Sequence, residues 1–381
     1  MHRPIKILHC LGTLDAGGVE TWLLHLLKSL DTKQFQFDFC TFGRRAGLYA
    51  PEVEKLGAKV FRCPQSENLW RFGRQFRQIL RQGKYDVVHS HVQAFSGALL
   101  RWAHLEGVQV RVAHSHGSHD GKSKTVGRRA YRLLMKRSIH RHATHGLAAS
   151  RLAADAIFLD WKNDPRVAIL HCGIDLKRFR GDFNCDEWRR KIDLPIGAQV
   201  IGNVANFVPA KNHGFFLEIA AEIRNHRPDM QFLLVGEGTL RAEIEARAWA
   251  MGFKGNMHFL GTRTDVPALL RTCIDAFVFP SLWEGLPLAL VEAQAAGLRC
   301  VISSAITSEV AILHHQIVQL PISMGVEKWA ITAIEAIDRG RFDAQSSTEA
   351  MQQTDFTIEH GLSLLVDIYS AGRTEANAAE I

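Results

Sequence analysis

Apolar residues along the chain form short runs that alternate with longer stretches of mixed polarity. Short apolar runs bounded by turn residues are typical of strands buried on both faces, and the stretches between them suit helices. Strands that alternate with helices indicate parallel α/β sheets. The pattern predicts strands at residues 5–10, 37–41, 87–90, 110–114 and 146–149 in the first half, and at 200–204, 232–235, 257–259, 276–279 and 300–303 in the second.

The length of 381 residues suggests two domains of ordinary size. A polar, charged segment with Pro195 and Gly197 marks the boundary between them. We therefore expect a first domain at residues 1–180, a linker region at 181–197, a second domain at 198–354, a C-terminal helix at 355–370 that is able to pack back on the first domain, and a disordered polar tail at 371–381.

The composition places the chain among globular proteins. Apolar residues make up 46% of it, no stretch of eighteen apolar residues occurs, and the N-terminus begins a strand rather than a signal peptide. We therefore expect a soluble cytoplasmic protein. The seven cysteines are odd in number and scattered, with no Cys-x-x-Cys pair, which argues for reduced thiols and against a disulfide scaffold or a zinc site.

The charge is unevenly distributed along the chain. The net charge is +7, but residues 1–180 carry +16 and the remainder carries −9. A basic half attracts nucleic acid, an anionic membrane or a phosphorylated acceptor. No helix-turn-helix or RNA-binding motif is present, so we expect no nucleic-acid partner.

Basic residues are densest between residues 122 and 141, where eight occur without an acid. Lys124, Arg128, Arg132 and Lys136 repeat every four residues and so share one face of a helix, with Arg129 beside them. These arginines and Lys136 predict a surface for an anionic membrane or an acceptor. A solvated basic helix face is the alternative.

Histidines stand at the ends of two predicted strands. One predicted strand ends in the His-Ser-His sequence of His89 and His91, and the next ends in the His-Ser-His sequence of His114 and His116. Ligands bind at the carboxyl ends of strands in open α/β sheets, and a neutral imidazole there is a candidate general base or oxyanion partner. His114, His116 and His119 also suggest a metal, but no carboxylate ligand has matching spacing, so we expect no metal site.

Glu284 and Glu292 lie eight residues apart in the segment 279–297. A buried strand, a Pro/Gly loop that carries Glu284, and an apolar helix that carries Glu292 and begins near Pro287 follow one another there. A carboxylate accepts hydrogen bonds from two vicinal hydroxyls, and a helix start offers N–H groups to a diphosphate. The segment therefore suits a nucleotide sugar, although a solvated loop and a surface helix give the same spacing.

Other loops at strand ends carry candidate phosphate-binding groups. Gly17 and Gly18 precede a helix and let its N–H groups approach a ligand, and Lys211 stands just before another helix. A tight turn and a solvated lysine are the alternatives. No Gly-x-Gly-x-x-Gly sequence is present, which disfavours a nicotinamide cofactor.

The motif Pro280-Ser-x-x-Glu-Gly-x-Pro-x-x-x-x-Glu292-Ala resembles the Glu-x7-Glu motif of the retaining glycosyltransferases of family 4. The Val-Ala-His-Ser-His strand and the Lys-Asn-His helix start further resemble the bacterial exopolysaccharide branch, and the resemblance extends from Ile5 to about Asp367. It implies the α/β GT-B fold, in which two Rossmann-like parallel-sheet domains face each other across a cleft. The N-terminal domain is then the acceptor side and the C-terminal domain binds the nucleotide sugar.

The resemblance also implies roles for residues. Glu292 would bind the ribose and Glu284 the donor sugar. The diphosphate would meet Lys211, Gly17 and Gly18, and Arg263 would border the base. Backbone N–H groups of the loop Gly285, Leu286 and Leu288 would bind the sugar or the diphosphate, and His116 would lie between donor and acceptor as a catalytic residue with Glu284.

The implied activity is retaining transfer of a sugar from a nucleotide sugar, with a UDP-sugar favoured over a GDP-sugar, to a lipid-linked or other saccharide acceptor in surface polysaccharide biosynthesis. No metal or other cofactor is implied, and the protein would be cytoplasmic or peripheral on the inner face of the plasma membrane. The chain departs from the family at Asn206, Cys172 and Ser304, and Asn206 replaces an arginine that contacts the diphosphate. Two alternatives are an epimerase-like GT-B enzyme and a non-catalytic GT-B binding protein.

Overall fold

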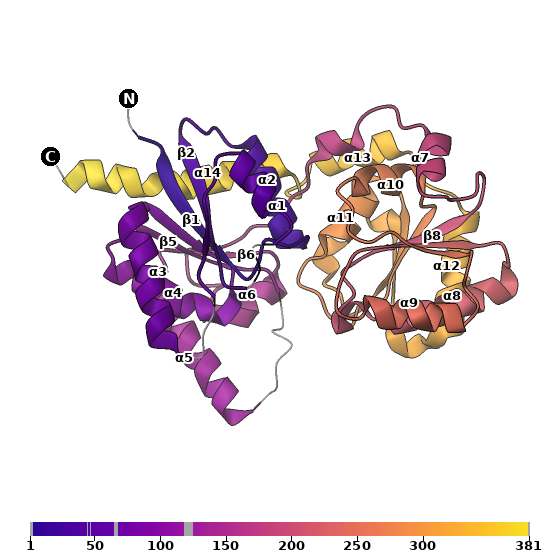
Figure 1. The fold of residues 1–381 in the computed structure, drawn as a ribbon, viewed down its shortest axis with the longest axis horizontal. Helices are drawn as coiled ribbons and strands as arrows, with labels where there is room; N and C mark the ends of the chain where they lie inside the picture. Colours follow the sequence, from indigo (N-terminus) through magenta and orange to yellow (C-terminus); the bar gives the residue numbers. More distant parts are fainter. Residues whose placement is uncertain (1–2, 44, 46, 65–67, 118–124, 380–381) are drawn as a thin grey trace. The chain divides into compact units, whose positions relative to one another are not determined.

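The computed structural model describes residues 3–43, 45, 47–64, 68–117 and 125–379. The chain divides into two compact units, which we describe separately. The first unit contains Met1–Gly173 and Ile358–Ile381, and the second contains Ile174–Thr357. Each unit is built on one sheet with helices on both faces (Figure 1).

The first sheet has the strand order β3-β2-β1-β4-β5-β6-β7, and all its neighbours are parallel. The order proceeds outward from β1 in both directions, which is the arrangement of a Rossmann-like sheet. The strands are β1 (Ile5–Leu11), β2 (Phe35–Thr41), β3 (Val60–Arg62), β4 (Val87–Ser90), β5 (Val110–Ser115), β6 (His145–Ala148) and β7 (Val167–Ile169).

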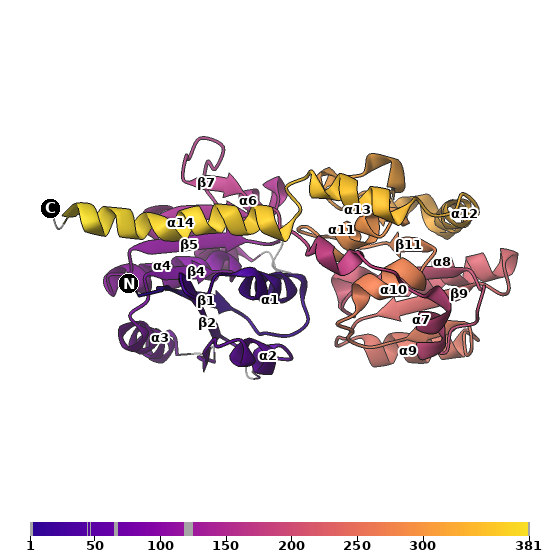
Figure 2. The ribbon, with the colours of Figure 1, turned by 90° about the horizontal axis from the view of Figure 1, so that it is seen from above.

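Helices cover both faces of the first sheet. Those of this unit are α1 (Gly18–Ser29), α2 (Ala50–Lys55), α3 (Leu69–Gly83), α4 (Ser96–Leu105), α5 (Val126–His142), α6 (Arg151–Ile157) and α14 (Ile358–Ala379). Phe72, Leu99 and Ile139 bring α3, α4 and α5 into one core. On the other face α14 contacts α1, β1 and β5, and Figure 2 shows it lying along the sheet. Trp22 and Tyr369 are fully buried there.

The second sheet has the order β10-β9-β8-β11-β12-β13 and is also parallel. Its strands are β8 (Val200–Val204), β9 (Gln231–Val235), β10 (Met257–Phe259), β11 (Ala276–Phe279), β12 (Arg299–Ser303) and β13 (Ile317–Leu320). One face is covered by α8 (His213–His226), α9 (Arg241–Ala250) and α12 (Gly325–Asp338). The other is covered by α7 (Cys185–Lys191), α10 (Val266–Thr272), α11 (Leu288–Ala295) and α13 (Ala344–Gln352).

The division between the units differs from the expected one. The first unit ends at Gly173 rather than at residue 180, and the predicted linker 181–197 belongs to the second unit. There α7 packs on α10, and Ile192 and Leu194 enter the core. The segment looked like a linker because its apolar residues are few, but two of them, Ile192 and Leu194, are buried.

Two further expectations were wrong. The strands β3, β7 and β13 were missed because they lie at sheet edges, are only three or four residues long, and are partly exposed, so they differ little from the loops around them. The tail predicted to be disordered from residue 371 is helical to Ala379, because α14 continues into it. The polar composition of this segment predicted a disordered tail, but the helix that begins at Ile358 continues through the segment.

Candidate donor site and histidine cluster

The segment that carries Glu284 and Glu292 has the predicted local structure. Strand β11 ends at Phe279, a loop follows, and α11 begins at Leu288 with Pro287 as its N-cap residue. Glu284 therefore lies on the loop and Glu292 inside the helix. In the loop Gly285 is buried and Leu286 is partly buried, and Leu288 opens the first turn of α11, where backbone N–H groups have no helical acceptor.

Lys211 reaches the same loop from the end of β8. The short 3-10 helix Pro209–Lys211 is joined to the β11 loop by a hydrogen bond from the Leu282 N–H to the Ala210 carbonyl (2.7 Å). Lys211 Nζ donates to Glu284 Oε1 and lies 5.2 Å from the centre of the Phe279 ring. The lysine expected at the diphosphate and the glutamate expected at the sugar are thus an ion pair, and both side chains are mostly shielded from solvent.

A left-handed residue allows this approach of the two loops. Asn212 has φ of 54° and ends the Pro209–Lys211 turn just before α8 begins, and asparagine tolerates this conformation better than most residues. Its Nδ2 donates to the Pro280 carbonyl at 3.2 Å. The Lys-Asn-His sequence therefore does two things, since Lys211 supplies the charge and Asn212 fixes the loop that carries it.

Glu292 is a partly buried carboxylate with no side-chain hydrogen bond within the described residues. Burial raises its pKa from 4.5 to about 7, and the guanidinium of Arg178 partly opposes this shift. Arg178 belongs to the 3-10 helix Leu176–Phe179 and donates to the Thr264 carbonyl. Sequence analysis did not identify Arg178, because it lies more than a hundred residues from Glu292 in a segment without a motif.

Arg263 and Asn206 occupy the neighbouring strand-end loops. The guanidinium of Arg263 donates to both carboxylate oxygens of Asp265, at 2.8 and 2.5 Å, which raises the Arg263 pKa. Arg263 is therefore already engaged in a bidentate pair. Asn206 is exposed, and its carbonyl accepts from the Val208 N–H at 2.8 Å.

In the first unit α1 begins at Gly18, with Gly17 as its N-cap residue. The carboxylate of Glu20 folds back over Gly17 so closely that a Cβ on Gly17 would clash with it. Burial raises the pKa of Glu20 to about 7, against the effect of a hydrogen bond from its own backbone. An acid thus covers the helix start that was expected to face a diphosphate. The sequence could have predicted this position of Glu20, because a glutamate three residues after the N-cap residue commonly bonds back to the backbone of that residue.

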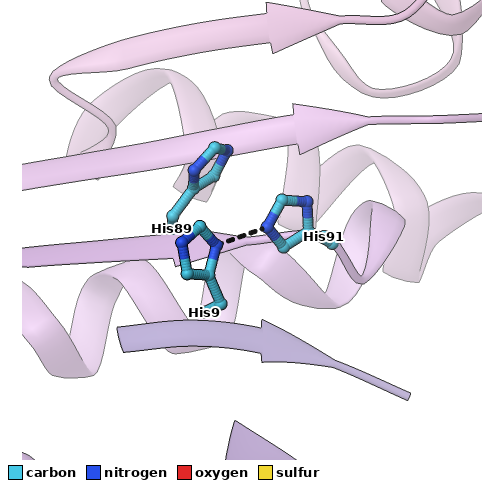
Figure 3. A group of neighbouring side chains, drawn as sticks. All are labelled: His9, His89 and His91. Carbon is cyan, nitrogen blue, oxygen red and sulfur yellow. Dashed lines mark hydrogen bonds between the residues drawn. The ribbon is translucent and has the colours of Figure 1, made fainter. Parts of the chain in front are cut away.

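His116 lies directly after β5 and belongs to a cluster of five histidines, namely His9, His89, His91, His114 and His116. Its Nε2 is 2.8 Å from His91 Nδ1, and its Nδ1 is 3.3 Å from the Cys172 thiol. His91 Nε2 is in turn 3.1 Å from His9 Nδ1, as Figure 3 shows. A second row connects His114 Nδ1 to His89 Nε2 (3.2 Å) and His89 Nδ1 to the Tyr369 hydroxyl (2.6 Å).

Burial keeps these imidazoles neutral. It lowers the pKa of His9 and of His116 to about 3 each, and it lowers the pKa of His89, His91 and His114 as well. The two His-Ser-His pairs are brought together as their sequence positions suggested. His9 was missed, although the parallel register of β1 and β4 places it directly beside His89.

The basic residues of α5 are not equivalent. Lys122 and Lys124, like His119, lie outside the described residues. Arg128, Arg132 and Lys136 are partly buried, and Lys136 donates to the Asp155 carbonyl at 2.7 Å. The exposed positions of the helix include Arg129, Leu133, Leu134, Arg137 and Arg141. None of the helices in the described ranges is long and apolar enough to cross a membrane.

Two parallel sheets of this strand order, each covered by helices on both faces, define the two-Rossmann-domain GT-B fold of glycosyltransferases. The sequence model named Glycosyltransferase Family 4 matches residues 16–178, and the one named Glycosyl transferases group 1 matches residues 184–318. The chain belongs to glycosyltransferase family 4, and it is a glycosyltransferase.

Individual relatives extend over most of the chain. The putative glycosyltransferase EpsF of Bacillus subtilis (strain 168) is 33% identical over 370 residues, which are 96% of each chain. The UDP-Gal:alpha-D-GlcNAc-diphosphoundecaprenol alpha-1,3-galactosyltransferase of Escherichia coli is 32% identical over 235 residues, or 60% of each chain. Anabaena HepE in complex with UDP has a TM-score of 0.76 at 17% identity, over 96% of this chain and 100% of that one.

Proposed function

We propose that the protein transfers a sugar from a nucleotide sugar to a lipid-linked saccharide, with retention of configuration, in surface polysaccharide biosynthesis. The observation that carries the proposal is the Lys211–Glu284 ion pair beside the start of α11, with the carboxylate of Glu292, which has no hydrogen-bond partner among the described residues, about one turn into that helix. The Escherichia coli relative is named for UDP-Gal and a diphosphoundecaprenol acceptor, and HepE was solved with UDP. A UDP-sugar is therefore favoured over a GDP-sugar.

Each residue has a role that its chemistry supports. Glu292 would accept hydrogen bonds from two ribose hydroxyls, and these donors would favour its charged form and so lower the raised pKa. On donor binding, Lys211 would leave its ion pair with Glu284 and bind the diphosphate instead. Glu284 would then accept hydrogen bonds from hydroxyls of the donor sugar. Backbone N–H groups around Gly285, Leu286 and Leu288 would complete the anion site at the start of α11.

The reaction we propose needs no metal, because Lys211 and the helix start supply the charge that stabilises the leaving diphosphate. The sugar–phosphate bond breaks on the same face that the acceptor attacks, and a departing phosphate oxygen takes the acceptor proton. We assign His116 to this step as a neutral hydrogen-bond partner, since its lowered pKa of about 3 excludes an imidazolium donor near pH 7. Gly17, Gly18 and Arg263 are assigned to the diphosphate and the base as the family pattern implies.

We further propose that the protein works in the cytoplasm, peripherally on the inner face of the plasma membrane. The exposed face of α5 combines Arg129 and Arg137 with Leu133 and Leu134. Such a combination attracts anionic headgroups and inserts apolar side chains at the interface. A lipid-linked acceptor would be found on that surface.

Incubation of the purified protein with a panel of UDP- and GDP-sugars and short lipid-diphosphate saccharides, read by mass spectrometry, tests the proposal. We expect one added hexose on the lipid-linked saccharide from a UDP-sugar in the presence of a chelator, and none with Glu284→Gln. Absence of transfer from every donor, with folded protein, would contradict the proposal.

Simpler measurements distinguish the proposed function from two alternatives. An epimerase-like enzyme would turn over the donor rapidly without any acceptor. A non-catalytic binding protein with a degenerate site would bind neither UDP nor GDP by calorimetry. The non-catalytic alternative rests on Asn206, which stands where the family pattern has an arginine that contacts the diphosphate.

A further inference from the structure

Three histidines of the cluster converge on one point. One ring nitrogen from each of His91, His114 and His116 lies within 4.8 Å of the other two, and His91 Nδ1 and His116 Nε2 are 2.8 Å apart. Since His114 Nδ1 contacts His89, the nitrogen of His114 that remains for this group is Nε2. The residues come from β5, from the residue after β5, and from the residue after β4.

The opposite nitrogen of each of these rings has its own partner. His91 Nε2 is 3.1 Å from His9 Nδ1, His114 Nδ1 is 3.2 Å from His89 Nε2, and His116 Nδ1 is 3.3 Å from Cys172 Sγ. If the converging nitrogens present lone pairs, each opposite nitrogen carries a proton and donates to its partner. This is the arrangement that orients histidine ligands in metal sites, where the outer N–H is hydrogen-bonded and sets the tautomer.

Without an ion, one polar atom in this group is unsatisfied. His114 Nε2 is fully buried and has no hydrogen-bond partner among the described residues. A backbone group of Leu170 acts on the His114 ring and partly opposes the fall in its pKa, but it makes no hydrogen bond of normal geometry to Nε2. A cation at the point of convergence would satisfy this nitrogen together with the two that face it.

A second group of histidines meets the same distance criterion but suits an ion less well. His9, His89 and His91 also bring one nitrogen each within 4.8 Å (Figure 3). All three are buried, and His9 Nε2 has no hydrogen-bond partner among the described residues. In the other group His116 is partly exposed, so that group is the one of the two with contact to solvent.

We propose that His91, His114 and His116 bind one divalent transition-metal ion of the class that prefers imidazole, such as Zn²⁺ or Co²⁺, with water in the fourth position. Three histidines and an open position are a known donor set for such ions. His9, His89 and Cys172 act as positioning residues for the ligands. A bound ion would occupy Nε2 of His116, a residue that the proposed transfer step also uses, so the metal-bound protein is a different form from the metal-free one proposed to carry out transfer. The test of the site therefore uses no activity assay.

Cobalt binding tests the site directly. The full-length protein, freed of metal with a chelator, is titrated with Co²⁺ alone. We expect one equivalent to bind, with the intense visible absorption of four-coordinate cobalt, and Zn²⁺ to displace it while raising the unfolding temperature. Retention of less than a tenth of an equivalent, or a spectrum of hexaaqua cobalt only, would overturn the proposal.

Two variants and a matched control locate the ion. His91→Gln and His114→Gln should each weaken Co²⁺ binding at least 100-fold. The exposed pair His314 and His315 is the control, and the double variant His314→Gln/His315→Gln should bind as wild type. Undiminished binding in His91→Gln would refute the assignment. If the two cluster variants fail to fold, X-ray absorption on zinc-loaded wild-type protein decides, because three imidazole ligands support the site and one or none excludes it.

Discussion

At the scale of single residues, Lys211 and Glu284 form an ion pair in the donor site, whereas in the proposed function each of them binds a different part of the donor. Lys211 and Glu284 neutralise each other, while the partly buried Glu292 has no side-chain hydrogen bond among the described residues. A site of this kind binds an anionic ligand by exchange, since the diphosphate replaces Glu284 at Lys211. The carboxylates should therefore differ in what their loss affects.

Replacement of each glutamate separates nucleotide binding from turnover. Glu292→Ala should weaken UDP binding by about 10–100-fold, the equivalent of about 1.4–3 kcal/mol, because the ribose loses its acceptor. Glu284→Ala should lower turnover more than UDP affinity, since UDP lacks the sugar that Glu284 contacts. Calorimetric UDP titration and initial rates measure the two effects, and wild-type UDP affinity in both variants would contradict the assignment.

The raised pKa of Glu292 has a consequence for stability. Between pH 4.5 and about 7 the folded protein keeps a proton on Glu292 that the unfolded chain has lost, so the free energy of unfolding falls as pH rises through this range. Glu292→Gln, which stays neutral, should therefore stabilise the protein more at pH 8 than at pH 5, by at most about 3 kcal/mol. Urea unfolding at both pH values measures this difference.

The matched control for this experiment is the exposed Glu327, which has no burial cost to relieve. Glu327→Gln should change stability little, and equally at both pH values. A pH-independent effect of Glu292→Gln would mean that its carboxylate is well solvated in the folded protein.

At the scale of elements, α5 has different faces for packing and for solvent. Gly97 of α4 lies so close to α5 that a Cβ there would be 2.5 Å from the Met135 carbonyl, and Ser138 donates to the Gly97 carbonyl at 2.6 Å. Lys136 of α5 donates to the carbonyl of Asp155 on α6. The exposed face therefore holds the charges that are free to meet a membrane.

Charge reversal on that face tests the membrane proposal. Arg129→Glu/Arg137→Glu should reduce sedimentation with anionic liposomes at low salt by about 10-fold or more, since each basic residue near the leaflet contributes about 1 kcal/mol. The control Lys254→Glu/Lys328→Glu makes the same change of charge at exposed positions of the second unit and should bind as wild type. If wild-type protein fails to sediment with these liposomes, the acceptor surface lies elsewhere.

At the scale of the whole molecule, the first unit contains both ends of the chain. Residues 174–357 form the second unit without interruption, whereas the first needs α14 from the C-terminus. Leu365 and Tyr369 of α14 are fully buried, and the Tyr369 hydroxyl contacts His89. Loss of this helix would expose the apolar face formed by α1 and the sheet.

The two units should therefore differ in whether they fold as separate fragments. A fragment of residues 174–357 should unfold cooperatively and bind UDP more weakly than the intact chain by no more than about 100-fold, because Lys211, Glu284 and Glu292 are all within it. A fragment of residues 1–173 should aggregate or remain a molten globule unless a peptide of residues 358–381 is added. Cooperative unfolding of residues 1–173 alone, by circular dichroism, would contradict the role given to α14.

The sequence by itself determined the parallel α/β class, the interior strands of both sheets, and the loop and helix that carry Glu284 and Glu292. These depend on local patterns, since an apolar run, a Pro/Gly loop and a helix start are read within twenty residues. Only the tertiary structure decided which distant residues meet. The Lys211–Glu284 pair, the effect of Arg178 on Glu292, and the union of His9 with both His-Ser-His pairs depend on strand order and register. Pairing of strands is long-range, and no residue pattern within one strand encodes its neighbour.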